Sequence, residues 1–123
     1  MDKAAATALS QDKVIDITTT GRRSGEAHRI EIWYHRVEGR YLITGRPGPR
    51  SWYADLVANP TFTFHLKESA EADLPARAIP ITKPQEKARL LSAAPSLQQY
   101  IGDDLDSWVQ GSPLVEVVFT DGD

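Results

Sequence analysis

Apolar and polar residues alternate along residues 28–37, 61–66 and 114–120 of the chain. Successive side chains of a β-strand point to opposite faces, so this alternation predicts three strands that each bury one face. The expected apolar faces are Ile30, Ile32 and Tyr34; Phe62, Phe64 and Leu66; and Val115, Val117 and Phe119. On the first strand the opposite, polar face carries Arg29, Glu31, Trp33 and His35.

Residues 14–20 and 41–44 are predicted to be strands on other grounds. The first stretch is β-branched except for Asp16, and stiff β-branched side chains pack well on a pleated sheet. The second stretch follows a tight reversal at residues 38–40, which makes it antiparallel to the strand at 28–37.

Proline and glycine mark where the sheet is interrupted. Residues 45–50 hold two of each and are predicted to form a basic loop, because prolines remove donors and glycines remove restraint. A polar hairpin loop is expected at 67–73. It leads into a sixth strand at 74–81, where Pro75 and Pro80 favour a sheet edge because proline cannot donate to the ladder.

Three short helices are predicted between the strands. Ser51 is expected to cap a helix over residues 52–58. Capping-box patterns, in which Thr or Ser precedes Gln by three residues, predict further helices over 82–93 and 96–102.

The remaining stretches carry no clear period. Residues 1–12 are expected to be a mobile, frayed terminus or a short helix, and residues 103–111 an irregular lid or terminal turn, with Trp108 in the core or in a dimer contact. Six mostly antiparallel strands with small helices predict a mainly β fold. A closed or nearly closed barrel is favoured because closure removes exposed strand edges.

The composition fits one globular domain over residues 1–123. There is no cysteine, which excludes disulfides and thiolate sites and fits a reducing, cytoplasmic setting. No apolar run approaches the roughly twenty residues that span a bilayer, so membrane insertion is not expected. The sequence pI near 5.6 argues against nucleic-acid binding.

Positive charge is concentrated in residues 21–50, which hold seven of the nine arginines and no lysine. With its three glutamates, this window has a net charge of +4. The net charge of the whole chain is −3, so the remaining residues together carry −7. Gly21 and Gly25 bracket two arginines and a serine, and this pattern predicts a sharp turn whose N–H groups and guanidinium forks could hold a phosphate. A solvated turn is the plain alternative; Arg46 and Arg50, in the loop after a neighbouring strand, favour the phosphate site.

No residue pattern indicates acid–base, nucleophilic or metal chemistry. His28 and His35 are an odd number of residues apart on one predicted strand and so point to opposite faces, which opposes a shared metal site. Ser51 lacks the G-x-S-x-G frame of a hydrolase nucleophile. We therefore expect no metal and assign no catalytic residue. Trp33 and Trp52 could wall a flat ring, although Trp52 and Leu56 could equally pin the short helix to the barrel.

Two motifs together indicate a family. The run TTGRRSG at 19–25, with Thr18 before it, and SWYADLVANP at 51–60 resemble the deazaflavin-dependent nitroreductase and quinone reductase family, with the match extending over about residues 14–66. Members of that family are split β-barrels related to FMN-binding, pyridoxamine-phosphate-oxidase-like proteins. The resemblance implies the reduced deazaflavin coenzyme F-420, hydride transfer to a quinone, nitroaromatic or conjugated enone, and a homodimer. An FMN-dependent enzyme and a non-catalytic deazaflavin-binding protein are the alternatives.

The resemblance also implies a set of site residues. The phosphate and anionic tail would lie on Arg22, Arg23, Ser24, Arg46 and Arg50, with His28 or Arg29 as a further basic group. The deazaflavin ring would be lined by Thr44, Gly45, Ser51, Trp52 and Asp55, with Trp33 nearby. Tyr100 and Trp108 are the expected wall of the acceptor site.

Overall fold

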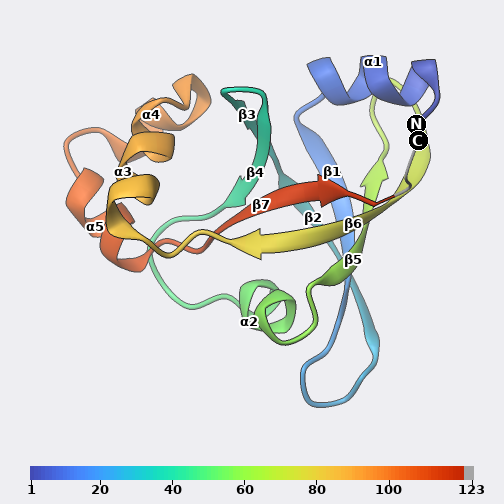
Figure 1. Cartoon of the computed structure of the whole chain (residues 1–123), viewed down its shortest axis with the longest axis horizontal. Helices are drawn as coiled ribbons and strands as arrows, with labels where there is room; N and C mark the ends of the chain where they lie inside the picture. Colours follow the sequence, from blue (N-terminus) through green and yellow to red (C-terminus); the bar gives the residue numbers. More distant parts are fainter. Residues whose placement is uncertain (121–123) are drawn as a thin grey trace.

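The structure is a computed structural model, and it describes residues 1–120; the end of the predicted domain, residues 121–123, lies outside the described part. Seven strands form one sheet (Figure 1). They are β1 (Val14–Thr20), β2 (Ala27–Trp33), β3 (His35–Val37), β4 (Arg40–Thr44), β5 (Thr61–Leu66), β6 (Ala72–Pro80) and β7 (Leu114–Phe119). The helices are α1 (Lys3–Gln11), α2 (Ser51–Ala58), α3 (Pro84–Ser92), the 3₁₀ turn η1 (Pro95–Leu97), α4 (Gln98–Ile101) and α5 (Leu105–Gly111).

The sheet is antiparallel throughout and curls into a half-barrel, which confirms the predicted mainly β barrel fold. Its strand order is β2-β1-β5-β6-β7-β4-β3, so that β2 and β3 lie at opposite ends of the ladder although they follow each other in the chain. One short segment therefore spans the open side of the half-barrel.

The predicted single strand at 28–37 is wrong, because the chain breaks at Tyr34. The Tyr34 N–H donates to the carbonyl of Lys13, and its hydroxyl donates to the carbonyl of Leu9, 2.9 Å away. These bonds replace the ladder at Tyr34, and after the break the side chains that point inward are different ones. His35, which was expected on the polar face, is therefore buried. Before the break, Ile30 is exposed, contrary to expectation, because β2 is an end strand.

Strand β6 is also placed differently from the prediction, because it lies inside the sheet between β5 and β7. The carbonyl of Pro75 accepts from Thr120, just beyond the end of β7. In an antiparallel strand the N–H and C=O of a residue point to the same side. The position where Pro75 lacks an N–H therefore faces the chain just beyond the end of β7, so the proline interrupts no hydrogen bond of the β6–β7 ladder.

The helix ends correct several expectations. Of the two alternatives for residues 1–12, the short helix is confirmed and the mobile terminus is wrong: Asp2 caps α1, and Ala5, Ala8 and Leu9 are buried. None of the three predicted serine or threonine caps forms: Ser51 is already the first residue of α2, α3 has no side-chain cap, and Ser96 bonds to His35 instead.

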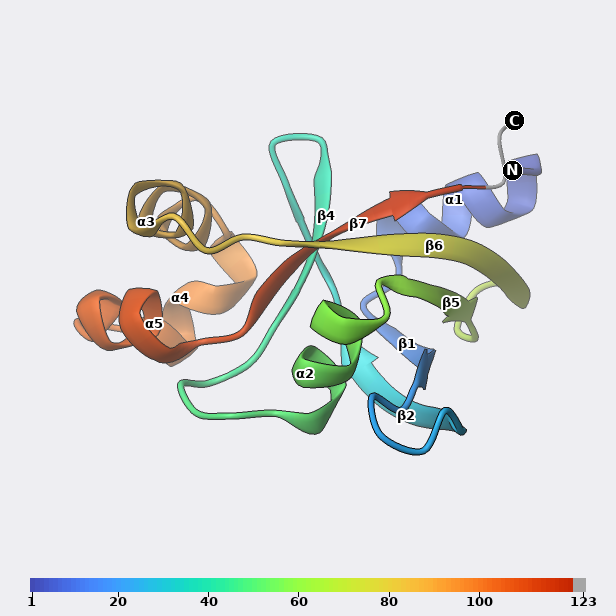
Figure 2. The ribbon, with the colours of Figure 1, turned by 60° about the horizontal axis from the view of Figure 1, so that its bottom comes forward.

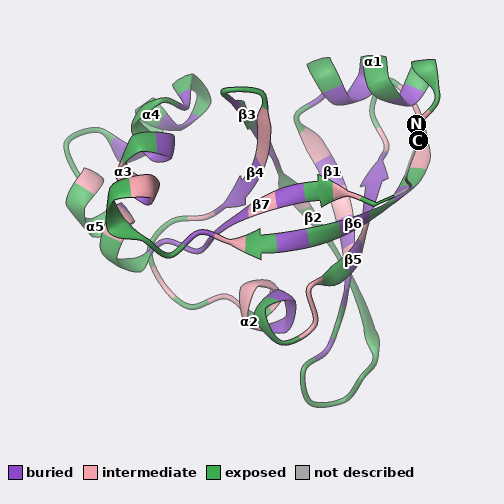
Figure 3. Cartoon of the chain, in the orientation of Figure 1, coloured by how far each residue is buried: buried purple, intermediate pink, exposed green. Residues whose placement is uncertain are grey.

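Two hydrophobic clusters fix the sheet. The first fills the half-barrel between the inner sheet face, α1 and α2; the second packs α3, α4 and α5 on the outer side of β3 and β4 (Figure 1, Figure 3). The stretch expected to be irregular is helix α5, and its Trp108 lies in the second cluster, 4% exposed. The half-barrel therefore has helices at the end where β4 leads into the basic loop.

Candidate functional site

The basic turn between β1 and β2 has a fixed shape. The N–H of Gly21 donates to the Glu26 carbonyl at 2.8 Å, and Gly25, at φ +72°, donates to the Gly21 carbonyl at 2.9 Å. A Cβ at Gly21 would lie 2.8 Å from both His28 Nε2 and Ser24 Oγ. A side chain at this position would have to displace the ends of these two side chains, which fold over the Gly21 backbone.

Helix α2 holds this turn through Asp55. The buried Asp55 carboxylate accepts from the Arg22 backbone N–H at 3.0 Å and from Arg22 Nη1 at 2.8 Å. The backbone hydrogen bond from Arg22 is the main reason that the pKa of Asp55 lies below its usual value. Residues 33 positions apart in the chain are thereby fixed to each other.

A hollow of about 300 Å³, the turn hollow, opens between the turn and the start of α2. The first turn of α2 has no side-chain cap, so its N–H groups and the positive end of its dipole are available there. The turn hollow is lined by Gly21, Arg22, Arg23, Ser24, His28, Ser51 and Asp55, six of which belong to the predicted site.

The arginines of the basic window differ in their partners. Arg22, Arg29 and Arg40 each pair with a carboxylate. Within residues 1–120, no carboxylate pairs with the three arginines Arg23, Arg46 and Arg50. Arg50 instead donates to backbone carbonyls of its own loop, and Arg46 lies over the Tyr100 ring, 5.2 Å from its centroid.

A second hollow, of about 220 Å³, has aromatic walls, and we call it the aromatic hollow. The loop after β4 forms one side of it, and α4 and α5 form the other. Figure 2 shows this loop running out toward α5, where the Gly48 N–H donates to the Gly111 carbonyl at 3.0 Å. The hollow is lined by Trp33, His35, Thr44, Gly45, Arg46, Leu97, Tyr100 and Trp108.

The aromatic hollow therefore brings four residues of the predicted coenzyme set together with the predicted acceptor wall. Sequence reasoning missed His35, because its burial depends on the break at Tyr34. It also missed Lys87, which lies with Arg50 on a larger hollow of about 630 Å³. Lys87 Nζ donates to the Ser112 carbonyl at 2.8 Å, and burial lowers the pKa of this amine. No local sequence pattern distinguishes this lysine from an exposed one.

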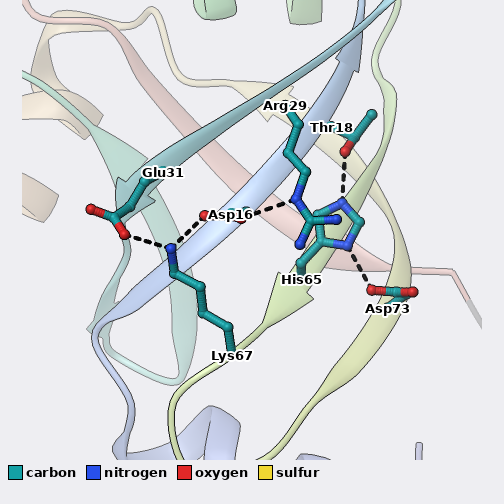
Figure 4. A network of polar contacts seen from close by, with 7 residues as sticks. All are labelled: Asp16, Thr18, Arg29, Glu31, His65, Lys67 and Asp73. Atoms are coloured by element: carbon teal, nitrogen blue, oxygen red, sulfur yellow. Dashed lines mark hydrogen bonds and ion pairs between the residues drawn. The ribbon is translucent and has the colours of Figure 1, made fainter.

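Two predicted residues lie apart from these hollows. Arg29 lies on the outer sheet face, where its Nε donates to Asp16 at 3.0 Å (Figure 4). Trp52 packs against the first hydrophobic cluster, with its ring edge-on to Tyr53. Trp52 therefore fits the alternative in which it anchors α2.

Two other kinds of site were sought in the described residues. In 1–120, no group of three or more His, Cys, Asp or Glu side chains could hold a metal ion. No helix in the same part of the chain is long and apolar enough to cross a bilayer.

Comparison with known proteins identifies the class. The profile of the F-420H(2)-dependent quinone reductase family matches residues 2–115, nearly the whole chain. The chain belongs to this family, and it is an F-420H2-dependent reductase family enzyme with the split-barrel fold. A search of curated protein sequences finds no match.

Solved structures share the fold at low sequence identity. The conserved hypothetical protein Rv2991 of Mycobacterium tuberculosis is 16% identical, with a TM-score of 0.70 over 97% of this chain and 81% of that one. An F-420-H2-dependent reductase, FDR-A, is 18% identical, with a TM-score of 0.61 over 87% and 95%. A protein described as a domain-swapped dimer is 21% identical, with a TM-score of 0.55 over 88% and 81%.

Proposed function

We propose that the turn hollow and the loop at 45–50 hold the anionic tail of coenzyme F-420, and that the aromatic hollow holds the deazaflavin ring edge and a quinone acceptor. The observation that carries this assignment is a set of arginines without a carboxylate partner: Arg23 lines the turn hollow, Arg46 lines the aromatic hollow, and Arg50 lies in the loop between them.

An anion gains most from charges that nothing else neutralises. A guanidinium already bonded to a carboxylate has a weaker field and fewer free donors. Arg23, with the uncapped start of α2, therefore suits a phosphate in the turn hollow, as helix N-termini do in many proteins. Arg46 and Arg50 would hold negative charge further along the loop.

Arg22 is given a different role. Its guanidinium and its backbone N–H both bond to Asp55 Oδ1, so its main task is to position the turn. In this arrangement Arg22 acts on a ligand through the shape of the turn, and Arg23 acts on it directly.

The residues at hand fit this coenzyme. F-420H2 supplies a hydride, so the protein needs to orient the two reactants and exclude water. The walls formed by Trp33, Tyr100 and Trp108 suit flat rings, and the glycine at position 45 permits close approach of the backbone. A hollow of about 220 Å³ is smaller than the roughly 300–1,000 Å³ of drug-sized sites, which favours an acceptor of one or two rings.

We further propose that the enzyme is a homodimer. β2 is an end strand, and in residues 1–120 no strand pairs with its outer edge. Two large apolar side chains of this strand, Ile30 and Trp33, are 36% and 50% exposed. Proteins generally cover such an edge strand. Because Trp33 also lines the aromatic hollow, a second copy over β2 would complete that wall. Light scattering during gel filtration tests this; a monomer at all concentrations would contradict it.

The function is tested by mixing the purified protein with reduced F-420 and 1,4-naphthoquinone and following the loss of the reduced chromophore. Titration of oxidised F-420 by fluorescence is measured in parallel. Tight binding without turnover would indicate a non-catalytic binding protein. A protein that purifies with bound yellow FMN and ignores F-420 would indicate the FMN alternative.

The site assignment is tested with a charge-matched pair of variants. Arg23→Ala should weaken F-420 binding by about tenfold or more, because a charge-assisted hydrogen bond contributes roughly 1.5–3 kcal/mol. Arg77→Ala removes the same charge from an exposed position on β6 that lines none of these hollows. Equal effects of the two variants would show that only net charge matters and would refute the assignment.

A further inference from the structure

The side chain of Trp108 lines the aromatic hollow. Trp108 is 4% exposed, and its Nε1 has no hydrogen-bond partner among residues 1–120. Yet no fully buried side-chain nitrogen or oxygen in the same residues lacks a partner. Nε1 must therefore face open space, and the aromatic hollow is the space that Trp108 lines.

His35 lines the aromatic hollow and also a neighbouring hollow of about 200 Å³, which Ser96 lines as well. Its Nδ1 lies 2.7 Å from Ser96 Oγ, and its Nε2 has no partner in the described chain, so Nε2 faces open space. Because the Nδ1 side of the ring is turned to Ser96, we assign Nε2 to the aromatic hollow. Burial, with a smaller contribution from the neighbouring Arg36 charge, lowers the pKa of His35 to about 4. The ring is therefore neutral near pH 7, and when the Ser96 hydroxyl donates to Nδ1, Nε2 carries the hydrogen.

The backbone that carries each ring is held in place. The Trp108 N–H donates to the Asp104 carbonyl at 3.2 Å in α5, and its carbonyl accepts from both the N–H and the hydroxyl of Ser112. His35 pairs with Leu42 in the β3–β4 ladder. Donors fixed before a ligand arrives need little reorganisation when charge develops near them.

Two other polar side chains of the hollow make contacts within the protein. The Thr44 hydroxyl donates to the Pro113 carbonyl at 2.5 Å, and the Arg46 guanidinium lies over Tyr100. Trp108 and His35 thus offer uncommitted nitrogens in a hollow whose other walls are largely aromatic.

We propose that Trp108 Nε1–H and His35 Nε2–H bind a carbonyl oxygen of the quinone acceptor and stabilise the negative charge that this oxygen gains during reduction. The inference rests on the proposed function, and it assigns two further catalytic residues and a carbonyl-bearing acceptor to the aromatic hollow.

The chemistry of the step explains why two donors help. A quinone takes up one hydride, which brings both electrons, and one proton from solvent to become a hydroquinone, while the coenzyme that gives the hydride is oxidised. Negative charge resides on a quinone oxygen after the hydride arrives and before the proton does. Neutral donors stabilise that oxygen without becoming acids themselves, as a neutral histidine does in other enzymes.

The binding step is tested by NMR of the ¹⁵N-labelled protein, with and without oxidised F-420. The three tryptophans give three indole N–H signals, and Trp108→Phe identifies the signal of Trp108. 1,4-Naphthoquinone should move the Trp108 signal downfield, whereas naphthalene, which has the same rings without carbonyls, should not. Equal shifts with both compounds, or no shift in either coenzyme state, would overturn the proposal.

The catalytic step is tested with variants that keep the ring shape or the donor. Trp108→Phe and His35→Phe should each lower kcat with 1,4-naphthoquinone by about tenfold to a hundredfold, up to the lower end of the roughly 10²–10³-fold seen when one oxyanion donor is lost, with a smaller effect on KM. His35→Gln keeps an N–H near the position of Nε2 and should recover part of the rate. Thermal melting confirms that each variant is folded.

Failure of this inference can be told apart from failure of the proposed function. If wild-type protein neither binds F-420 nor reduces the quinone, the proposed function fails. If it does both, while folded Trp108→Phe and His35→Phe variants keep full kcat, this assignment alone is wrong.

Discussion

Two regions of this molecule use basic side chains differently. On the outer face of β1, β2 and β5, Arg29 and Lys67 both bond to Asp16, at 3.0 and 2.6 Å, and Lys67 also bonds to Glu31 (Figure 4). Arg23 of the turn hollow, Arg46 of the aromatic hollow and Arg50 of the loop between them have no such partner in the described residues. A cluster of positive residues in a sequence is thus no measure of available charge; compensation by distant carboxylates decides it.

The outer network satisfies its own members. Hydrogen bonding by Lys67 is the main cause of the lowered pKa of Asp16, and Asp16 in turn raises the pKa of Lys67. Beside it, His65 Nδ1 lies 2.7 Å from Asp73 Oδ1, and its Nε2 lies 2.7 Å from Thr18 Oγ1. The charges of Asp16, Arg29, Glu31 and Lys67 each have a neighbour of opposite sign, so the network stabilises the sheet and leaves little field for a ligand.

The largest effect is expected from removing two uncompensated charges. Arg23→Ala combined with Arg46→Ala should weaken F-420 binding by at least about 100-fold, because two charge-assisted contacts are lost. Fluorescence titration measures it, and Arg29→Ala combined with Arg77→Ala is the charge-matched control. If the control variant binds F-420 as weakly as the test variant, the two regions do not differ in their use of arginine.

The next largest effect, on stability, is expected when Arg22 loses the carboxylate that neutralises its charge. Asp55→Asn keeps the shape of the side chain but removes the charge that holds Arg22, and it should lower the free energy of unfolding by about 1–3 kcal/mol. Urea denaturation measures this, with Asp103→Asn, an exposed residue without a described partner, as the control. Unchanged stability would mean that α2 does not hold the turn through this bond.

The same carboxylate predicts a pH dependence. Because the pKa of Asp55 is lower in the folded state, its contribution is complete above the unfolded value near 3.9 and is lost as the pH falls through the folded value. The stability difference between wild type and Asp55→Asn should therefore shrink on acidification from about pH 7 to about pH 3. Urea midpoints across this range measure it; a constant difference would assign the effect to packing.

The smallest effect is expected in the outer network. Arg29 is 54% exposed at its side chain and Asp16 keeps its bond to Lys67, so Arg29→Ala should change stability by no more than about 1 kcal/mol. F-420 affinity should change by less than about twofold, which corresponds to less than roughly 0.5 kcal/mol of binding free energy. A larger loss of affinity would place Arg29 in the coenzyme site after all.

Much of the fold could be predicted because its signals are local. The alternation in β5 and β7, the β-branched run of β1 and the reversal before β4 depend on residues close in sequence, and the structure confirms these strands. The break at Tyr34 could not be predicted, since it depends on bonds to the distant carbonyls of Lys13 and Leu9. The missed burial of His35 follows from that break.

The site shows the same division. The glycine-bracketed turn and the motif that begins with Ser51 are contiguous, and they led to the family that the comparisons confirm. Which arginines are free depends on Asp55 and Asp16, and a linear pattern does not show those pairings. The assignment of individual residues to the coenzyme remains a prediction that the variants above test.

The strand order also has a kinetic consequence. β4 pairs with β7, so that Tyr41 lies opposite Val117, and the two ends of the ladder are joined through Tyr34. Such contacts close very large loops, and domains dominated by them fold in milliseconds to seconds instead of microseconds. The aromatic hollow, which is lined by Trp33 from one end of the ladder and by His35 from the other, is therefore expected to be among the last parts of the molecule to assemble after synthesis.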